Sequence, residues 1–149
     1  MSRHVDVALE GVRIPLARAD AAAIAQGVLR AERVRDALLS ITFVTNRRIA
    51  ALNREYLGHA GATDVISFGF RRDAVGAPVI GDVYIAVGVA RAAAAAHRIP
   101  VREELARLVV HGTLHVLGYD HPEGEERLAS AMWARQERLL ARLARAGGR

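Results

Sequence analysis

Residues 111 to 121 read His111-Gly-Thr-Leu-His115-Val-Leu-Gly118-Tyr-Asp-His121. Residues four apart on an α-helix project from the same side, so His111 and His115 can both reach one cation. Gly118 suits the end of that helix, where a residue free to take a positive φ lets the chain reverse and bring His121 back toward the first two. Pro122 disfavours a helical conformation at His121. The stretch therefore predicts a metal site of three histidines, built from one helix and the turn that ends it.

The spacing H-x3-H-x2-G-x2-H is the zinc-binding pattern of the metzincin proteases, with one difference. Those proteases carry the Glu that acts as general base directly after the first His, whereas this chain has Gly112. Three neutral imidazoles leave the fourth position of a tetrahedral zinc open to water, as in hydrolytic sites. We therefore expect one zinc ion per chain. The alternative is that the histidines are ordinary surface or core residues.

The same block, H-G-x-L-H-x-L-G-Y-D-H, resembles the signature of the YbeY family of zinc-dependent endoribonucleases. Two further segments resemble this family, namely Leu52-Asn53 followed by Thr63-Asp-Val-Ile-Ser-Phe68, and Gly81-Asp-Val-Tyr-Ile85. The resemblance covers roughly residues 40 to 125 of the chain. It implies a fold in which the metal helix is placed as in zincins.

The resemblance also implies a function, that of a single-strand-specific, zinc-dependent endoribonuclease. The implied work is ribosomal RNA maturation, including the 3′ end of the small-subunit RNA, and ribosome quality control, so the expected partners are single-stranded RNA, ribosomal RNA and the ribosome. One alternative is a metal-dependent peptidase or amidase, which the missing Glu at position 112 disfavours. The other is a ribosome- or RNA-binding module in which the histidines hold a structural metal.

Arginines are the candidate contacts to RNA, because a phosphodiester transition state gains negative charge that Arg can stabilise. Many members of the family carry Arg directly after the aromatic residue that follows L-N, but here Leu57 follows Tyr56. The candidates that remain near the motifs are Arg54, Arg71 and Arg72, although surface arginines are commonly only solvated.

Three carboxylates near the motifs each allow two roles. Asp120 is a candidate to orient a metal-bound imidazole by a hydrogen bond to the ring, or else to cap the helix that follows. Asp64 and Asp82 fall on neighbouring predicted strands, where they either position water or simply face solvent. The general base is not identified by the sequence.

Length and composition indicate the number of domains, the possible metal ligands and the kind of partner. The 149 residues suit one domain spanning residues 1–149, and the absence of cysteine excludes disulfides and thiolate metal ligands. The net charge is +5 and every basic residue is Arg, which favours a polyanionic partner, although a general bias toward Ala and Arg explains the charge equally well. No signal peptide or apolar span is recognisable, so we expect a cytoplasmic protein without a membrane partner. Oligomeric state is not indicated.

The periodicity of the chain predicts an α+β class, with a small mixed β-sheet of about four strands packed with helices. Strands and helices mix without a repeated βαβ rhythm, and the last two strands are expected to form an antiparallel hairpin. The predicted strands cover residues 3–9, 37–44, 63–70 and 79–87. The predicted helices cover residues 16–34, 47–56 with Asn46 as cap, 90–98, a stretch from 101 onward, and a stretch after Pro122.

The helix from residue 101 carries one apolar stripe, which the histidines flank. The stripe consists of Leu105, Leu108, Val109, Gly112 and Val116. Glycine within it would let another element approach closely. A similar stripe in the final helix consists of Leu128, Met132, Leu139 and Leu143, which makes Met132 a core residue rather than the floor of a metal pocket.

Overall fold

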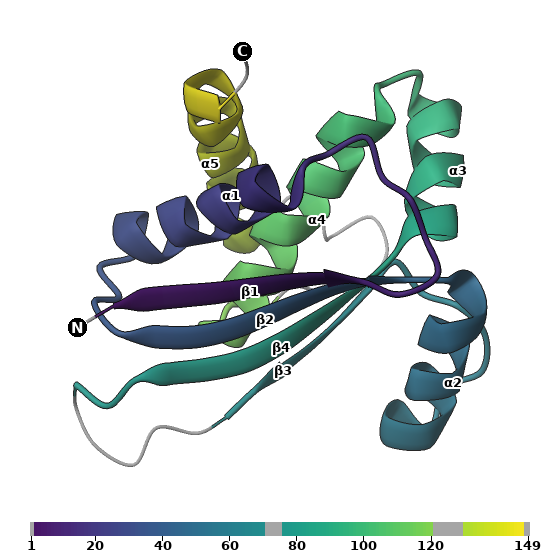
Figure 1. The fold of residues 1–149 in the computed structure, drawn as a ribbon, viewed down its shortest axis with the longest axis horizontal. Coiled ribbons are helices and arrows are strands. Elements are labelled where there is room, and N and C mark those ends of the chain that lie inside the picture. The colour runs from purple at the N-terminus through teal and green to yellow at the C-terminus, as the bar shows by residue number, and fades with distance from the viewer. Residues whose placement is uncertain (1, 71–75, 121–129, 148–149) are drawn as a thin grey trace.

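A computed structural model of the chain describes residues 2–70, 76–120 and 130–147 (Figure 1). The fold is α+β, as predicted, and its sheet has four strands. The strands are β1 (Arg3–Leu9), β2 (Ala37–Val44), β3 (Val65–Gly69) and β4 (Val79–Ala86). The helices are α1 (Arg18–Ala31), α2 (Asn46–Leu57), α3 (Val87–His97), α4 (Val101–Val116) and α5 (Ala131–Gly147).

The sheet is mixed, with the strand order β1-β2-β4-β3. Strands β1, β2 and β4 run parallel, whereas β3 pairs with β4 in the predicted antiparallel hairpin and forms one edge. Within this sheet β1, α1 and β2 form a single βαβ unit, which is not repeated along the described chain. The long connection through α1 provides the crossover that a parallel pair requires.

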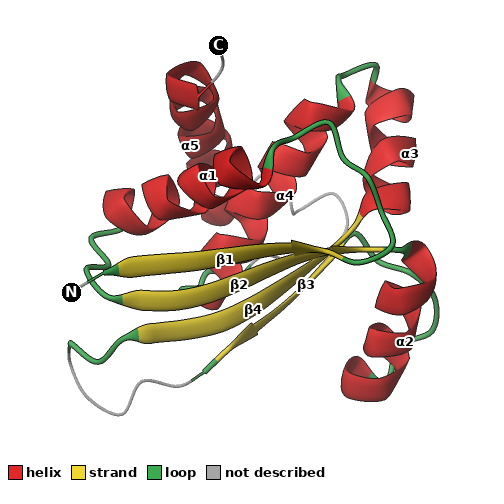
Figure 2. Cartoon of the chain, viewed as in Figure 1, coloured by secondary structure: helices red, strands yellow, loops and turns green. Residues whose placement is uncertain are grey.

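Helices cover the two faces of the sheet unequally (Figure 2). Helices α1 and α4 pack on one face of the sheet, and α5 packs against these two helices. The main core lies between this helical layer and the strands. Helix α2 lies on the opposite face, where Ile49 and Leu52 pack against Ile66 of β3 and a few neighbours. The helix that carries the histidines is therefore on the better covered side. None of the helices in the described ranges is long and apolar enough to cross a membrane.

Helix α2 begins differently from the prediction. Thr45, and not Asn46, is the N-cap, and its Oγ1 accepts a hydrogen bond of 3.1 Å from the backbone N–H of Arg48. The Asn46 side chain instead accepts a hydrogen bond of 2.9 Å from the N–H of Val89, near the start of α3. A tertiary partner has therefore displaced the local cap that the sequence suggested.

Helix α4 forms and ends for reasons visible in its sequence. Glu103 and Glu104 lie in its first turn, where negative charge is favourable. At the other end Gly118 has a φ of +104°, as predicted. The N–H of Tyr119 donates to the carbonyl of Leu114, and the N–H of Gly118 donates to the carbonyl of His115. This pair of bonds is a Schellman motif, which ends the helix and reverses the chain at Gly118.

Glycines let α4 approach the β3–β4 hairpin closely, as the position of Gly112 predicted. A Cβ atom built on Gly112 would lie 2.5 Å from Cγ1 of Val83 and 3.3 Å from Oγ of Ser67. One turn further on, Val116 of α4 lies over Gly81, where a built Cβ would come within 2.4 Å of its Cγ1. Backbone and small side chains thus set the distance between the histidine helix and the hairpin.

The close contact at Gly112 predicts the effect of adding a methyl group there. Gly112→Ala should lower the free energy of unfolding by about 1–3 kcal/mol, because the overpacking against Val83 outweighs a gain in helix propensity of about 1 kcal/mol. Urea unfolding followed by circular dichroism measures the change.

A double-mutant cycle with Val83→Ala is the control for this prediction, since that substitution removes the methyl groups that would clash. The double variant should lose less stability than the sum of the two single variants. Strictly additive losses would show that the contact with Val83 is not the cause.

Candidate functional site

His111 and His115 lie one turn apart on α4, as predicted. Their ring centroids are 4.7 Å apart and the rings meet edge to face, with an interplanar angle of 76°. His111 is only 3% exposed, while His115 is half-buried. Two imidazoles in this arrangement can each coordinate the same cation through a ring nitrogen.

His121, the third predicted ligand, lies outside the described residues, so the three-histidine set remains a prediction. Within residues 2–70, 76–120 and 130–147 no group of three or more His, Cys, Asp or Glu side chains is arranged to hold a metal ion. What the structure does define is the setting of the first two histidines and of the turn that leads toward the third.

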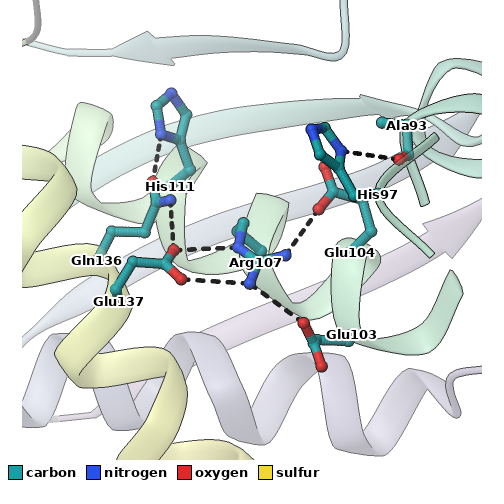
Figure 3. A network of polar contacts seen from close by, with 8 residues as sticks. All are labelled: Ala93, His97, Glu103, Glu104, Arg107, His111, Gln136 and Glu137. Atoms are coloured by element: carbon teal, nitrogen blue, oxygen red, sulfur yellow. Dashed lines mark hydrogen bonds and ion pairs between the residues drawn. The ribbon is translucent and has the colours of Figure 1, made fainter. Parts of the chain in front are cut away.

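Gln136 of α5 contacts the Nδ1 atom of the His111 ring. Nδ1 of His111 lies 2.5 Å from Oε1 of Gln136, and Gln136 is 1% exposed (Figure 3). Our sequence analysis missed this residue, although a signal was present. Position 136 falls on the apolar stripe between Met132 and Leu139, and a polar residue at a core position is a sign that it has a specific partner.

Tyr119 of the motif is also linked to α5. The link is the carboxylate of Glu32, at the end of α1, which contacts both Tyr119 and Arg135 of α5. The Tyr119 hydroxyl donates a hydrogen bond of 2.5 Å to Oε1 of Glu32. Arg135 donates to the other oxygen of Glu32 from Nε at 2.8 Å and from Nη2 at 2.6 Å. The turn after His115 is thus fixed by residues far away in the sequence.

This contact shifts the ionisation of Glu32. Burial alone would raise its pKa, but the hydrogen bonds from Tyr119 and Arg135 and the charge of Arg135 outweigh burial and lower the pKa below its ordinary value of 4.5. The same bond raises the pKa of Tyr119, because the Glu32 carboxylate accepts a hydrogen bond from the protonated hydroxyl and burial disfavours a phenolate. Glu32 is therefore ionised, and Tyr119 protonated, near neutral pH.

The other motif segments act structurally in the described part of the chain. Asn53 is buried, and its Nδ2 donates a 3.0 Å hydrogen bond to the carbonyl of Gly61, which holds the loop before β3. Oγ of Ser67 donates a hydrogen bond of 3.2 Å to the carbonyl of Gly112, which links β3 to α4. Met132 is 2% exposed and belongs to the main core, which confirms the packing role predicted for it.

The remaining candidates are not brought beside the histidines. Arg54 is exposed in the last turn of α2, on the opposite side of the sheet from α4. Asp82 also faces that side, because its neighbours Gly81 and Val83 face α4, and it accepts a 2.5 Å bond from Oγ of Ser40. Asp120 is exposed at the end of a described range, and Leu57 is exposed on α2. Arg71 and Arg72 lie outside the described residues.

Comparisons with known proteins identify the chain. The family model described as "Endoribonuclease YbeY" matches residues 10–144. A protein named Endoribonuclease YbeY from Geobacillus kaustophilus is 46% identical over 114 residues, covering 70% of this chain and 71% of the relative. Another of that name, from Bacillus licheniformis, is 38% identical over 153 residues, covering 95% of this chain and 96% of the relative.

A solved structure has the same fold. The solution structure of TM1509 from Thermotoga maritima superposes with a TM-score of 0.65, covering 96% of this chain and 91% of that one at 22% identity. The family matches over most of the chain define an α+β enzyme of the hydrolase class. The chain belongs to the Endoribonuclease YbeY family.

The lowered pKa of Glu32 predicts a stability that depends on pH. A carboxyl group with a depressed pKa in the folded state stabilises the fold above its unfolded-state pKa, and this contribution is lost as pH falls through the folded-state value. Glu32→Gln should therefore lower the free energy of unfolding by about 1–3 kcal/mol at pH 7. The difference from the wild type should shrink as the pH is lowered below 4.5, the ordinary value.

Urea unfolding at a series of pH values measures this difference. Glu55→Gln, an exposed position on α2, is the matched control and should stay within about 0.5 kcal/mol of the wild type. A Glu32→Gln deficit that persists undiminished in acid would contradict the assignment.

Proposed function

We propose that this chain is a zinc-dependent, single-strand-specific endoribonuclease that acts in ribosomal RNA maturation, including the 3′ end of the small-subunit RNA, and in ribosome quality control. Membership of the Endoribonuclease YbeY family supports the reaction and its RNA substrate. The observation that carries the proposal is the pair of histidines on one side of α4, with Nδ1 of His111 held by a buried glutamine.

We assign one zinc ion per chain to His111, His115 and His121. The first two fit this role because neutral imidazole is a usual zinc ligand and their rings lie 4.7 Å apart. Nδ1 of His111 faces Gln136, so Nε2 is the nitrogen that would bind the metal. His121 enters through the motif spacing alone. When bound, zinc lowers the pKa of water and so supplies a nucleophile near neutral pH.

Arginines would hold the phosphates of the RNA. Arg54 is exposed on α2, and we keep Arg71 and Arg72, which follow β3 in the sequence, as the other candidates. The net charge of +5 favours a polyanion. Because α2 and α4 lie on opposite faces of the sheet, an RNA strand that contacts both Arg54 and the histidines must pass around the sheet.

Two further assignments complete the proposal. Asp120, the residue before His121, would accept a hydrogen bond from a zinc-bound imidazole and so fix its orientation. The substrate implies that the protein works in the cytoplasm, in contact with ribosomes.

The packing of Gly112 argues against a peptidase. A metzincin-like general base would be a Glu at this position, but a Cβ atom there would lie 2.5 Å from Cγ1 of Val83. The close approach of α4 to the hairpin thus leaves no room for that side chain.

Replacement of one histidine tests the proposal. Purified wild-type protein should contain about one zinc per chain and cleave a labelled single-stranded RNA. His115→Ala should bind zinc more than about 100-fold more weakly and lose cleavage, because a first ligand is removed. Mass spectrometry of the metal content and gel analysis of the RNA measure both properties.

His97→Ala is the matched control, since His97 is exposed on α3 and bonds only to its own helix among the described contacts, through Nδ1 and the carbonyl of Ala93. This variant should keep both zinc and activity. Zinc bound by the wild type without RNA cleavage would favour a binding module, and a wild type that binds no zinc would remove the basis of the proposal.

A further inference from the structure

A series of hydrogen bonds connects a partly buried ion-pair cluster to His111 (Figure 3). Arg107 of α4 donates to Glu137 of α5, from Nε to Oε2 at 3.0 Å and from Nη2 to Oε1 at 3.2 Å. Oε2 of Glu137 also accepts a 3.0 Å hydrogen bond from Nε2 of Gln136. Oε1 of Gln136 then lies 2.5 Å from Nδ1 of His111.

The chemistry of each group fixes which atom donates and which accepts in this series of hydrogen bonds. An ionised carboxylate only accepts hydrogen bonds, so Glu137 requires the amide nitrogen of Gln136 on its side. The carbonyl oxygen of Gln136 must then face His111. Since that oxygen only accepts, Nδ1 of His111 must carry the proton. In a neutral imidazole this leaves the lone pair on Nε2, the form that binds a metal through Nε2.

The ion-pair cluster around Arg107, from which these hydrogen bonds begin, is firmly held. Besides Glu137, Arg107 contacts Glu104 at 2.8 Å and Glu103 at 3.2 Å, both from its own helix. The Arg107 side chain is only 17% exposed, and its pKa is raised, because the bonds to these carboxylates outweigh the effect of burial. A permanent cation with a bidentate partner on α5 fixes Glu137 relative to α4.

We infer that Gln136 is a positioning residue for the metal ligand His111, and that Glu137, held by Arg107, sets the orientation of the Gln136 amide. The ion-pair cluster thereby selects the imidazole tautomer that can bind zinc through Nε2. This inference rests on the proposed role of His111 as a ligand. Its decisive readout, however, is the tautomer in metal-free protein, which requires neither zinc nor RNA.

Nitrogen-15 spectra of the side chains test the inference, since they distinguish the protonated from the unprotonated ring nitrogen. In metal-free wild-type protein His111 should be protonated at Nδ1. Gln136→Met keeps the volume but removes the acceptor, so His111 should become a mixture of tautomers. Zinc affinity, measured by chelator competition, should fall about 10–100-fold.

Two more substitutions separate orientation from simple packing. Gln136→Glu combined with Glu137→Gln places an acceptor opposite His111 and keeps a donor between positions 136 and 137. This double variant should return both the Nδ1–H tautomer and most of the zinc affinity, whereas a purely structural defect would persist. Glu137→Gln can donate as well as accept, so the Gln136 amide loses its fixed orientation and a tautomer mixture should appear without removal of any contact to His111. Gln26→Met, on α1, is the matched control and should change neither readout.

The inference is overturned if wild-type His111 is protonated at Nε2, or if Gln136→Met leaves the tautomer unchanged. A wild-type protein with the expected tautomer but no zinc affinity would instead refute the proposed function and leave the hydrogen-bond chain standing.

Discussion

The close approach of α4 to the β3–β4 hairpin is the constraint on which the rest of the site depends. Glycines at positions 81 and 112 remove the side chains that would hold the two layers apart, and Val116 and Val83 fill the space. His111 and His115 adjoin these contacts in sequence, so their position relative to the edge strand follows from backbone packing. A larger residue at the interface would move the histidines as well as destabilise the core.

Helix α5 contributes the orientation that α4 cannot supply alone. Three consecutive residues reach three different targets, since Arg135 contacts Glu32, Gln136 contacts His111 and Glu137 contacts Arg107. Adjacent residues on a helix point in different directions, so one short segment can bind α1 and two places on α4 at once. The histidine helix and the end of α1 are thus both fixed by side chains of α5.

Local signals in the sequence predicted much of the fold. Alternation identified β1 and a β-branched run identified β2, both at their observed bounds. The helix spacing paired His111 with His115, and Gly118 ended α4 as expected. Strand order was not predictable, because parallel pairing depends on long-range contacts that leave no mark in periodicity. Gln136 was missed because a single polar residue in an apolar stripe shows that a partner exists without showing which one. Nothing in the described residues tests the assignment of His121.

The bond between Tyr119 and Glu32 joins residues 87 positions apart, and Arg135 reaches the same carboxylate across 103 positions. Helix α5 follows α4 in the chain, so during translation the histidines are made before the side chains that orient them. A nascent or proteolytically shortened polypeptide lacking α5 would carry both histidines of α4 but not their hydrogen-bonded setting. The order of synthesis therefore delays the assembly of the hydrogen-bonded setting of His111 until α5 has been made.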